Sequence, residues 1–417
     1  MPAILEYAGA STRATLAKAR HKKKCKNSPA VRPFLGYAKW EVNMRGKGAV
    51  LVGICTLLFA FGASGQKKEA STRGQEKWRV GEPVVYENLS VFPLLARGSA
   101  DTGGFLTLDE GLTSGEVVVT ETGGDMLRRT RGSDPSVGIQ AQMQVAQVNQ
   151  LVLINRSKKP LLLLAGEVVT GGKQDRIIAK DRIVSPGSEP LPLDVFCVEH
   201  GRWTGVSSQF KAANMMVHPS VREKAVVDQS QSDVWVTVTA GSSQRASAGS
   251  AAPRAITPEV ISGVIAGEAQ SQSYLKIMQS ARVGGQVDSF AGEVARRFAR
   301  AVESLKEEQV VGVVVAYGGE VAWADAFASP VLFNRYWPKL LRSYAVEALA
   351  RPQGREHASL QDATEFARPL IGHETVESEP GVYRWREVVQ GRLVEVYLDS
   401  LSGEALTLHW CKVLRTI

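Results

Sequence analysis

Residues 161–203 read LLLLAGEVVTGGKQDRIIAKDRIVSPGSEPLPLDVFCVEHGRW, and this stretch decides what fold we expect. Short apolar runs alternate in it with glycine and proline, a pattern typical of β-strands joined by turns. Charged residues of both signs stand between the runs. A buried charge is costly unless it pairs or binds something, so the stretch is also the first candidate for a functional site.

The rest of the first half has the same character. Residues 116–122 (EVVVTET) are dense in β-branched side chains, which favour strands. Residues 148–155 form a further apolar run, and a segment of turn composition, 155–160 (NRSKKP), separates it from residue 161. Several short strands with turns between them predict a β-rich portion of sandwich or barrel-like arrangement.

The second half mixes helix and strand patterns. Residues 310–317 (VVGVVVAY) are continuously apolar, which is typical of a buried strand, and Gly318-Gly319 turns this strand into the next one. Residues 382–389, 393–398 and 405–413 read as three more strands. An amphipathic helix is predicted by apolar side chains at four-residue spacing, namely Phe290, Val294, Phe298 and Val302. We therefore expect an α+β fold, with a β-rich N-terminal portion and a mixed α/β C-terminal portion.

The net charge of +8 comes from one end of the chain. Residues 1–65 hold eleven of the 50 Lys and Arg and two of the 42 Asp and Glu, which leaves 39 basic and 40 acidic residues in 66–417. A nucleic-acid partner needs a basic surface on the folded domain. The body of this chain has no such excess, so no nucleic-acid partner is expected.

The leader has the form of a secretory signal peptide. Residues 44–48 (MRGKG) are a basic start, residues 49–60 an apolar run, and Ala63-Ser64-Gly65 a small-residue cleavage site. We expect Met44 to be the true start, residues 1–43 to be an upstream extension, and the mature protein to be exported, periplasmic or extracellular, after cleavage near Gly65. The protein would contact a membrane only through this signal segment. The alternative is a basic tail followed by one anchor helix.

Composition then divides the chain. Residues 240–256 are rich in Ser, Ala and Gly with few bulky apolar side chains, which is typical of a linker or loop. The expected segments are 1–43 (extension), 44–65 (signal peptide), 66–80 (disordered), 81–239 (β-rich portion ending in a helix), 240–256 (linker) and 257–417 (α+β portion).

Two cysteines, Cys197 and Cys411, remain after the leader. In an exported protein they can form one disulfide, or they can be two buried thiols that behave as small apolar side chains, and the sequence leaves both open. No CxxC spacing occurs, and the spacing of acidic and histidine residues fits no metal-ligand pattern, so no metal site is predicted. No cofactor is indicated either.

The turn at residues 171–176 (GGKQDR) has two interpretations. A Gly171-Gly172 pair lets backbone N–H groups approach an anion, with Lys173, Gln174 and Arg176 completing the contact and Lys180 and Asp181 following close behind. Asp175 would orient a sugar hydroxyl or act as a base. The alternative is an ordinary hairpin turn with Lys173, Asp175 and Arg176 paired at the surface.

Two further places offer acid–base chemistry. Glu199 and His200 follow an apolar strand, with Arg202 and Trp203 beside them as a charged contact and a stacking surface. The alternative is a structural corner with Trp203 in the core. Glu167 follows a buried-type run directly, and an inward carboxylate needs a cation, for which Arg176 and Arg182 are candidates.

The 161–203 stretch resembles the bacterial family named the ARG and rhodanese-phosphatase-superfamily-associated protein domain, in which ARG stands for ADP-ribosylglycohydrolase. Residues 321–330 (VAWADAFASP) and 332–349 (LFNRYWPKLLRSYAVEAL) carry the resemblance further, from about Val84 to the C-terminus. The resemblance implies an association with ADP-ribose or nucleotide-related chemistry. It carries over no catalytic residue.

Three functions follow. The first is binding of a small anionic or sugar-containing ligand, with ADP-ribose or a nucleotide as examples, by Gly171, Gly172, Lys173, Gln174, Arg176, Lys180, Asp181, Arg202 and Trp203. The second is hydrolysis of a nucleotide-derived or ADP-ribose-like substrate by Glu167, Asp175, Glu199 and His200. The third is a structural module with a protein partner. P-loop, GxSxG and HExxH motifs are absent, which favours binding over catalysis.

Overall fold

The computed structural model describes residues 78–122, 149–200, 207–240, 272–303, 305, 308–351 and 356–416. All of them belong to the unit formed by Lys67–Ile417. The expected extension, signal peptide and nearly all of the linker lie outside the described residues, as do Gly201, Arg202 and Trp203. The side chain of His200 also lies outside them, although its backbone is described.

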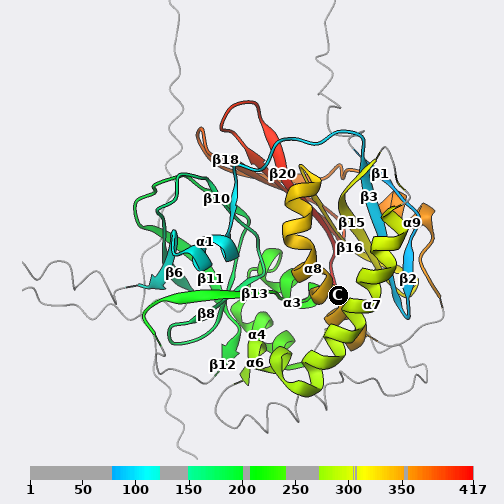
Figure 1. Cartoon of the computed structure of the whole chain (residues 1–417), viewed down its shortest axis with the longest axis horizontal. Coiled ribbons are helices and arrows are strands. Elements are labelled where there is room, and N and C mark those ends of the chain that lie inside the picture. Colours follow the sequence, from blue (N-terminus) through cyan, green and yellow to red (C-terminus); the bar gives the residue numbers. More distant parts are fainter. Residues whose placement is uncertain are drawn as a thin grey trace, which may run out of the picture. The chain divides into compact units, whose positions relative to one another are not determined.

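A nine-stranded antiparallel sheet forms one side of the fold (Figure 1). Its strand order is β1-β3-β15-β16-β20-β19-β18-β17, with β2 paired to β3. The bounds are β1 (Arg79–Val80), β2 (Val84–Tyr86), β3 (Leu89–Ala96), β15 (Gln309–Tyr317), β16 (Glu320–Phe327), β17 (His373–Glu379), β18 (Tyr383–Gln390), β19 (Leu393–Ser400) and β20 (Leu406–Leu414). The sheet therefore takes strands from both sides of residues 240–256.

The remaining strands form smaller sheets. Six strands follow the order β13-β8-β9-β11-β6-β5, and a bridge between Thr120 and Gln209 links the two outer strands. A three-stranded sheet has the order β10-β7-β4, and β12 pairs with β14. The bounds are β4 (Leu106–Thr107), β5 (Val117–Glu121), β6 (Gln150–Asn155), β7 (Leu161–Leu163), β8 (Glu167–Gly171), β9 (Arg176–Ile178), β10 (Arg182–Val184), β11 (Leu191–Cys197), β12 (Glu199–His200), β13 (Phe210–Met216) and β14 (Gln272–Ser273).

The helices pack against these sheets (Figure 1). They are α1 (Leu108–Ser114), α3 (Pro219–Val226), α4 (Gln231–Ala240), α6 (Tyr274–Gln279), α7 (Ala281–Glu303), α8 (Pro330–Ala350) and α9 (Leu360–Phe366). The predicted stripe lies on α7, where Phe290, Val294 and Phe298 are buried. The Ser329 side chain accepts the Leu332 N–H at the start of α8 and caps this helix.

Strand alternation places the cores on separate faces. The largest core lies where α3, α6, α7 and α8 meet one face of the large sheet. A second core is shared by α1, the six-stranded sheet and the three-stranded sheet. A third lies on the other face of the large sheet, where α9 covers β15 and β16 and Trp410 of β20 packs against Trp78. The fold is α+β, as predicted.

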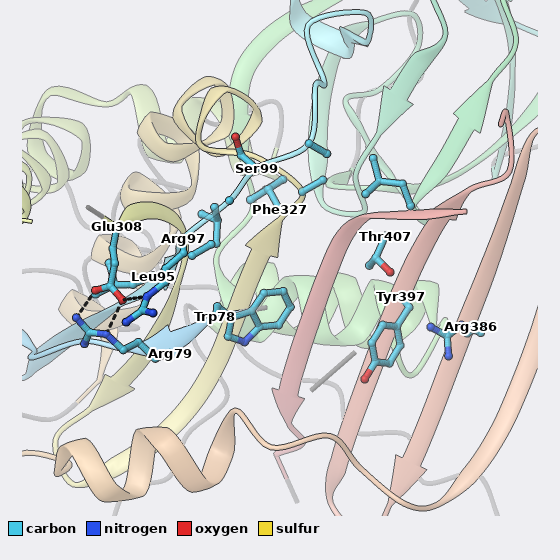
Figure 2. Close-up of a pocket in the computed structure, with 16 residues that line it drawn as sticks. Trp78, Arg79, Leu95, Arg97, Ser99, Glu308, Phe327, Arg386, Tyr397 and Thr407 are labelled. Carbon is cyan, nitrogen blue, oxygen red and sulfur yellow. Dashed lines mark hydrogen bonds and ion pairs between the residues drawn. The ribbon is translucent and has the colours of Figure 1, made fainter. Parts of the chain in front are cut away.

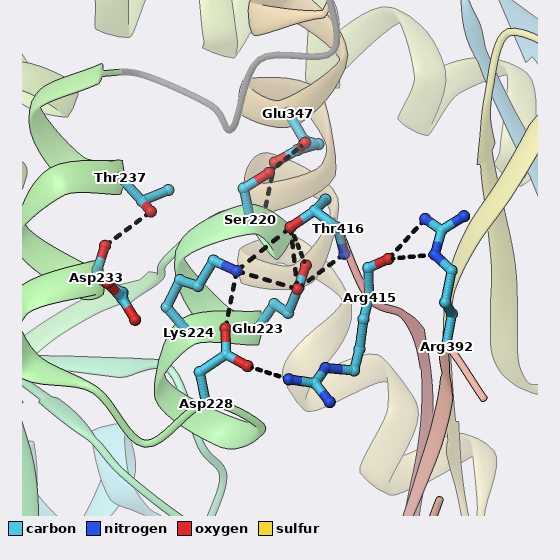
Figure 3. A network of polar contacts seen from close by, with 10 residues as sticks. All are labelled: Ser220, Glu223, Lys224, Asp228, Asp233, Thr237, Glu347, Arg392, Arg415 and Thr416. Atoms are coloured by element: carbon cyan, nitrogen blue, oxygen red, sulfur yellow. Dashed lines mark hydrogen bonds and ion pairs between the residues drawn. The ribbon is translucent and has the colours of Figure 1, made fainter. Parts of the chain in front are cut away.

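The C-terminal end of β20 is tied to α3 (Figure 3). Thr416 donates its backbone N–H to Glu223 over 2.9 Å, and Arg415 pairs with Asp228 at 2.7 Å. Lys224 bridges Asp228 and Glu223 from the helix itself. These contacts hold α3 against the large sheet, which positions Arg222 on its buried side.

Gly312 tests the close packing of this sheet. A Cβ at this position would lie 2.3 Å from the backbone oxygen of Asp325 and 2.6 Å from Ala326 Cα. We expect Gly312→Ala to destabilise the protein by about 1–3 kcal/mol, measured by urea denaturation, because the backbone of β16 must move.

Gly285 is the matched control. It is exposed in α7 and a Cβ there meets nothing within 4 Å. Gly285→Ala should stabilise the protein by about 0.5–1 kcal/mol, because alanine favours a helix. If the two substitutions changed the free energy of unfolding equally, the close packing of β15 against β16 would be contradicted.

Candidate functional site

Asp181, His409, Asp325 and Arg222 form a buried ionic network. The Nδ1–H of His409 donates to Asp181 Oδ2 over 2.5 Å, and its Nε2–H donates to Asp325 Oδ1 over 3.0 Å. Arg222 pairs with Asp325 Oδ2 at 2.9 Å. All four side chains are at most 3 % exposed. The network joins the loop before β10 with β16, β20 and α3.

Further donors surround Asp325. The indole N–H of Trp323 donates to its Oδ2 over 2.8 Å, and the hydroxyl of Tyr344 on α8 donates to the same oxygen. Burial raises the pKa of Asp325, but Arg222 and His409 outweigh this effect and bring it down to about 2. Burial lowers the pKa of His409, yet Asp181 and Asp325 raise it to about 9. His409 is therefore an imidazolium at neutral pH.

Glu167 belongs to a neighbouring cluster. Its Oε2 accepts the N–H of Leu164 over 2.7 Å, and its Oε1 pairs with Lys339 of α8, which also pairs with Asp109 of α1. Burial opposes the charge of Lys339, but the two carboxylates raise its pKa above the ordinary value. The inward orientation predicted for Glu167 is confirmed. The expectation of Arg176 or Arg182 as its cation is wrong, because α8 brings Lys339 closer than either strand residue.

Asp175 and Glu199 lie together in a second buried place. Asp175 accepts hydrogen bonds from the hydroxyls of Thr170, at 2.7 Å, and Ser273, at 2.9 Å. Its backbone N–H donates to Glu199 Oε2 over 3.0 Å. Asp175 is 4 % exposed and Glu199 1 %. The backbone of His200 pairs with Gln272 of β14.

The turn at residues 171–176 holds a carboxylate from its own chain. The backbone N–H of Lys173 donates to Oε1 of Glu121 over 2.8 Å. Gly171 and Gly172 have φ values of +135° and +52°, which favour glycine. The antiparallel pairing of β8 with β9 makes this turn a hairpin, as the alternative had it. Asp175 and Arg176 are buried, so the expectation that these charges pair at the surface is wrong.

Lys180 and Arg182 reach the edge of the large sheet. Lys180 pairs with Glu377 at 2.6 Å and lies over the Trp385 ring, and Arg182 pairs with Glu379 at 3.5 Å. The predicted site charges that the structure describes are therefore distributed among buried clusters, one turn and these surface pairs. None of these predicted residues is among those that line the cavity described next.

A cavity of about 780 Å³ lies beside the large sheet (Figure 2). Its charged lining comes from Arg79, Arg97, Glu308 and Arg386, and its larger apolar and aromatic lining from Trp78, Leu95, Phe327 and Tyr397. Ser99 and Thr407 add hydroxyl groups. These residues come from β1, β3, β16, β18, β19, β20 and the loops beside them.

Sheet register builds the aromatic side of this cavity. Arg386 of β18 lies opposite Tyr397 of β19, which lies opposite Trp410 of β20. Residues opposite each other on neighbouring strands share one face. Arg386 lies over the Tyr397 ring at 4.4 Å, and Trp78 packs on Trp410 with ring centroids 5.4 Å apart. The cavity therefore has an aromatic wall with a cation at its far side.

A family model for the ARG and Rhodanese-Phosphatase-superfamily-associated Protein domain matches residues 77–410. The chain belongs to this family, ARPP-1. The resemblance noted in the sequence is thus confirmed. Searches of curated proteins and of solved structures gave no match.

The 161–203 stretch did not point to the cavity of this ARPP-1 domain. Its charged and aromatic lining is dispersed over residues 78–97, 308, 327, 386 and 397. Pairing of β3 with β15, of β15 with β16 and of β18 with β19 brings these segments together. In the sequence, the pattern that could have indicated this cavity is the pair Trp78-Arg79, a tryptophan beside an arginine.

Cys197 and Cys411 of the ARPP-1 domain are both buried thiols and are not joined in a disulfide. Burial raises the pKa of Cys197 to about 11. Among the residues that the structure describes, no group of His, Cys, Asp and Glu can hold a metal ion. No helix in the described ranges is long and apolar enough to cross a membrane.

His409 gives the ARPP-1 domain a pH dependence. Its folded pKa of about 9 lies above the ordinary 6.5, so its contribution is complete below 6.5 and is lost as pH rises through 9. This difference corresponds to about 3 kcal/mol. We expect the stability advantage of the native protein over His409→Gln to shrink by this amount between about pH 6 and pH 10.

Urea denaturation of both proteins across this range measures the effect. Groups other than His409 that titrate at alkaline pH are present in both proteins. Their contribution cancels when the unfolding free energy of His409→Gln is subtracted from that of the native protein. A constant difference from acid to alkaline pH would show that His409 is not charged in the folded protein.

Proposed function

We propose that this domain is a binding module that holds a small anionic ligand with a flat or sugar ring in the cavity of Figure 2. The observation that carries the proposal is the cavity itself, whose volume of about 780 Å³ is of the size that small-molecule sites have. Its lining is mainly apolar with a few polar groups, as in ligand sites generally.

The charge of the cavity favours an anion. Three arginines, Arg79, Arg97 and Arg386, face one acidic residue, Glu308. Arg79 is neutralised by a bidentate pair with Glu308, and Arg386 is held by Asp399 and Glu374. Arg97 is 89 % exposed, and its contact with Glu308 is 3.9 Å long. Arg97 therefore has donors to offer a ligand.

The rings of Trp78 and Tyr397 favour a ligand with a flat face. Aromatic side chains stack on bases and on the apolar faces of sugars. Trp78 is already supported from behind by Trp410, so little conformational freedom is lost when a ligand stacks on it. A sugar phosphate, a nucleotide or ADP-ribose has both an anionic group and such a face.

Binding is better supported than hydrolysis. The acid–base candidates Glu167, Asp175 and Glu199 are at most 4 % exposed and are hydrogen-bonded to protein groups. A group that must reach a substrate needs a path to it. The cavity contains one carboxylate, Glu308, which Arg79 occupies.

Two broader proposals accompany this one. We propose that the six-stranded sheet is a barrel-like N-terminal portion, on the support of the Thr120–Gln209 bridge between its outer strands. We also propose that the protein is exported, on the support of the signal-peptide pattern at residues 44–65.

Arg97→Ala tests the binding function. A hydrogen bond to a charged group contributes about 1.5–3 kcal/mol, so affinity should fall roughly 10-fold to 100-fold. Calorimetric titration with ADP-ribose, nucleotides and sugar phosphates measures it. The melting temperature without ligand should stay unchanged, because exposed pairs contribute little to stability.

Arg156→Ala is the control, since Arg156 is exposed and does not line the cavity. It should bind like the native protein. A ligand that binds the native protein and Arg97→Ala equally would place the site elsewhere. Absence of any ligand response would favour a structural module instead.

A further inference from the structure

Arg176 is a buried cation that lacks a counter-ion among the residues the structure describes. It lies at the start of β9 and is 1 % exposed. Its guanidinium donates two long hydrogen bonds, 3.3 Å to Gln174 Oε1 and 3.4 Å to the Asp175 carbonyl oxygen. Its Nε has no acceptor within the described ranges. No carboxylate in the described ranges forms an ion pair with it.

Such a cation is unfavourable. The penalty for burying an ion is several kcal/mol even after relaxation, and arginine cannot lose its proton to avoid it. Arg222, the other buried arginine in the described ranges, pairs with Asp325. An anion beside Arg176 would remove the penalty.

A carboxylate lies at the same end of the six-stranded sheet. Arg176 is opposite Cys197 in the β9–β11 register, and the charges of Arg176, Glu121 and Glu199 all act on the Cys197 thiol. Glu121 is the last residue of β5. Among the residues that the structure describes, Glu121 forms no ion pair with Arg176, and its Oε1 accepts the Lys173 N–H of the turn.

The turn is shaped around this carboxylate. A Cβ at Gly172 would lie 2.5 Å from Glu121 Oε1 and 2.4 Å from the Phe210 ring. Backbone N–H groups of glycine-rich turns are common anion-binding elements. Glu121, Gly171 and Lys173 are half-buried, so solvent reaches this part of the turn.

We propose that the turn at residues 171–176 is a second anion site, in which the Glu121 carboxylate occupies the place that a free phosphate or carboxylate group takes. The incoming anion binds the Lys173 N–H and pairs with Arg176, and Glu121 moves to solvent. The site is independent of the cavity lined by Arg97 and Trp78.

Inorganic phosphate and the full chain test the proposal, with the melting temperature and calorimetric affinity as readouts. Phosphate should stabilise the native protein, and Glu121→Gln should bind it about 10-fold more tightly, because the competing charge is gone. Arg176→Met should lose the response and melt no lower than the native protein without phosphate, because it removes an unpaired buried charge.

The controls separate this site from the cavity. Arg156→Met changes an exposed arginine and should respond like the native protein. Arg97→Ala weakens anion binding in the cavity, so a phosphate response that this variant retains belongs to the turn. If Arg97→Ala loses the response while Arg176→Met keeps it, phosphate binds in the cavity and the proposal is overturned.

Two further results would overturn it. One is a Glu121→Gln variant with native or weaker phosphate affinity, which remains decisive if Arg176→Met fails to fold. The other is an unchanged phosphate response in a destabilised Arg176→Met variant, which would make Arg176 a structural residue.

Discussion

The fold depends on the buried imidazolium of His409 between two carboxylates. Asp181 comes from the loop between β9 and β10, Asp325 from β16, and Arg222 from α3, so the network connects the small sheets, the large sheet and a helix. The network has no net charge, because the two aspartates are balanced by one imidazolium and one guanidinium. Removal of one member would leave an uncompensated charge in the core, and breaking a buried pair in this way typically costs about 3–5 kcal/mol.

Helix α8 extends the same principle. Lys339 pairs with Glu167 and Asp109, and Glu347 accepts from Ser220 of α3 and pairs with Arg351. His409 and Trp410 are neighbours on β20 and point to opposite faces of the sheet. The ionic network thus lies on the face of the large sheet that meets α3 and α8. Trp410 supports Trp78 beside the cavity on the other face.

Local patterns predicted the elements whose signal is local. The four-residue stripe on Phe290, Val294 and Phe298 became α7, and the apolar run at 310–317 became β15. The three C-terminal strands became β18, β19 and β20. The need of Glu167 for a cation was also readable, since an acidic residue after a buried run must be paired.

Local patterns could not predict which residues, far apart in the sequence, pair with one another. Lys339 is 172 residues from Glu167, and His409 is 228 residues from Asp181. The cavity is similarly assembled from separate segments by strand pairing, so its arginines looked like ordinary surface charges in the sequence. The charges of the 161–203 stretch were correctly recognised as needing partners, and most of those partners are protein groups.

The most direct measurement is the ¹⁵N NMR spectrum of the His409 ring, titrated with pH and assigned by comparison with His409→Gln. We expect both ring nitrogens to be protonated at neutral pH and the imidazolium to lose one proton near pH 9. A single protonated ring nitrogen at neutral pH would contradict it, because a neutral imidazole cannot donate to Asp181 and Asp325 at the same time.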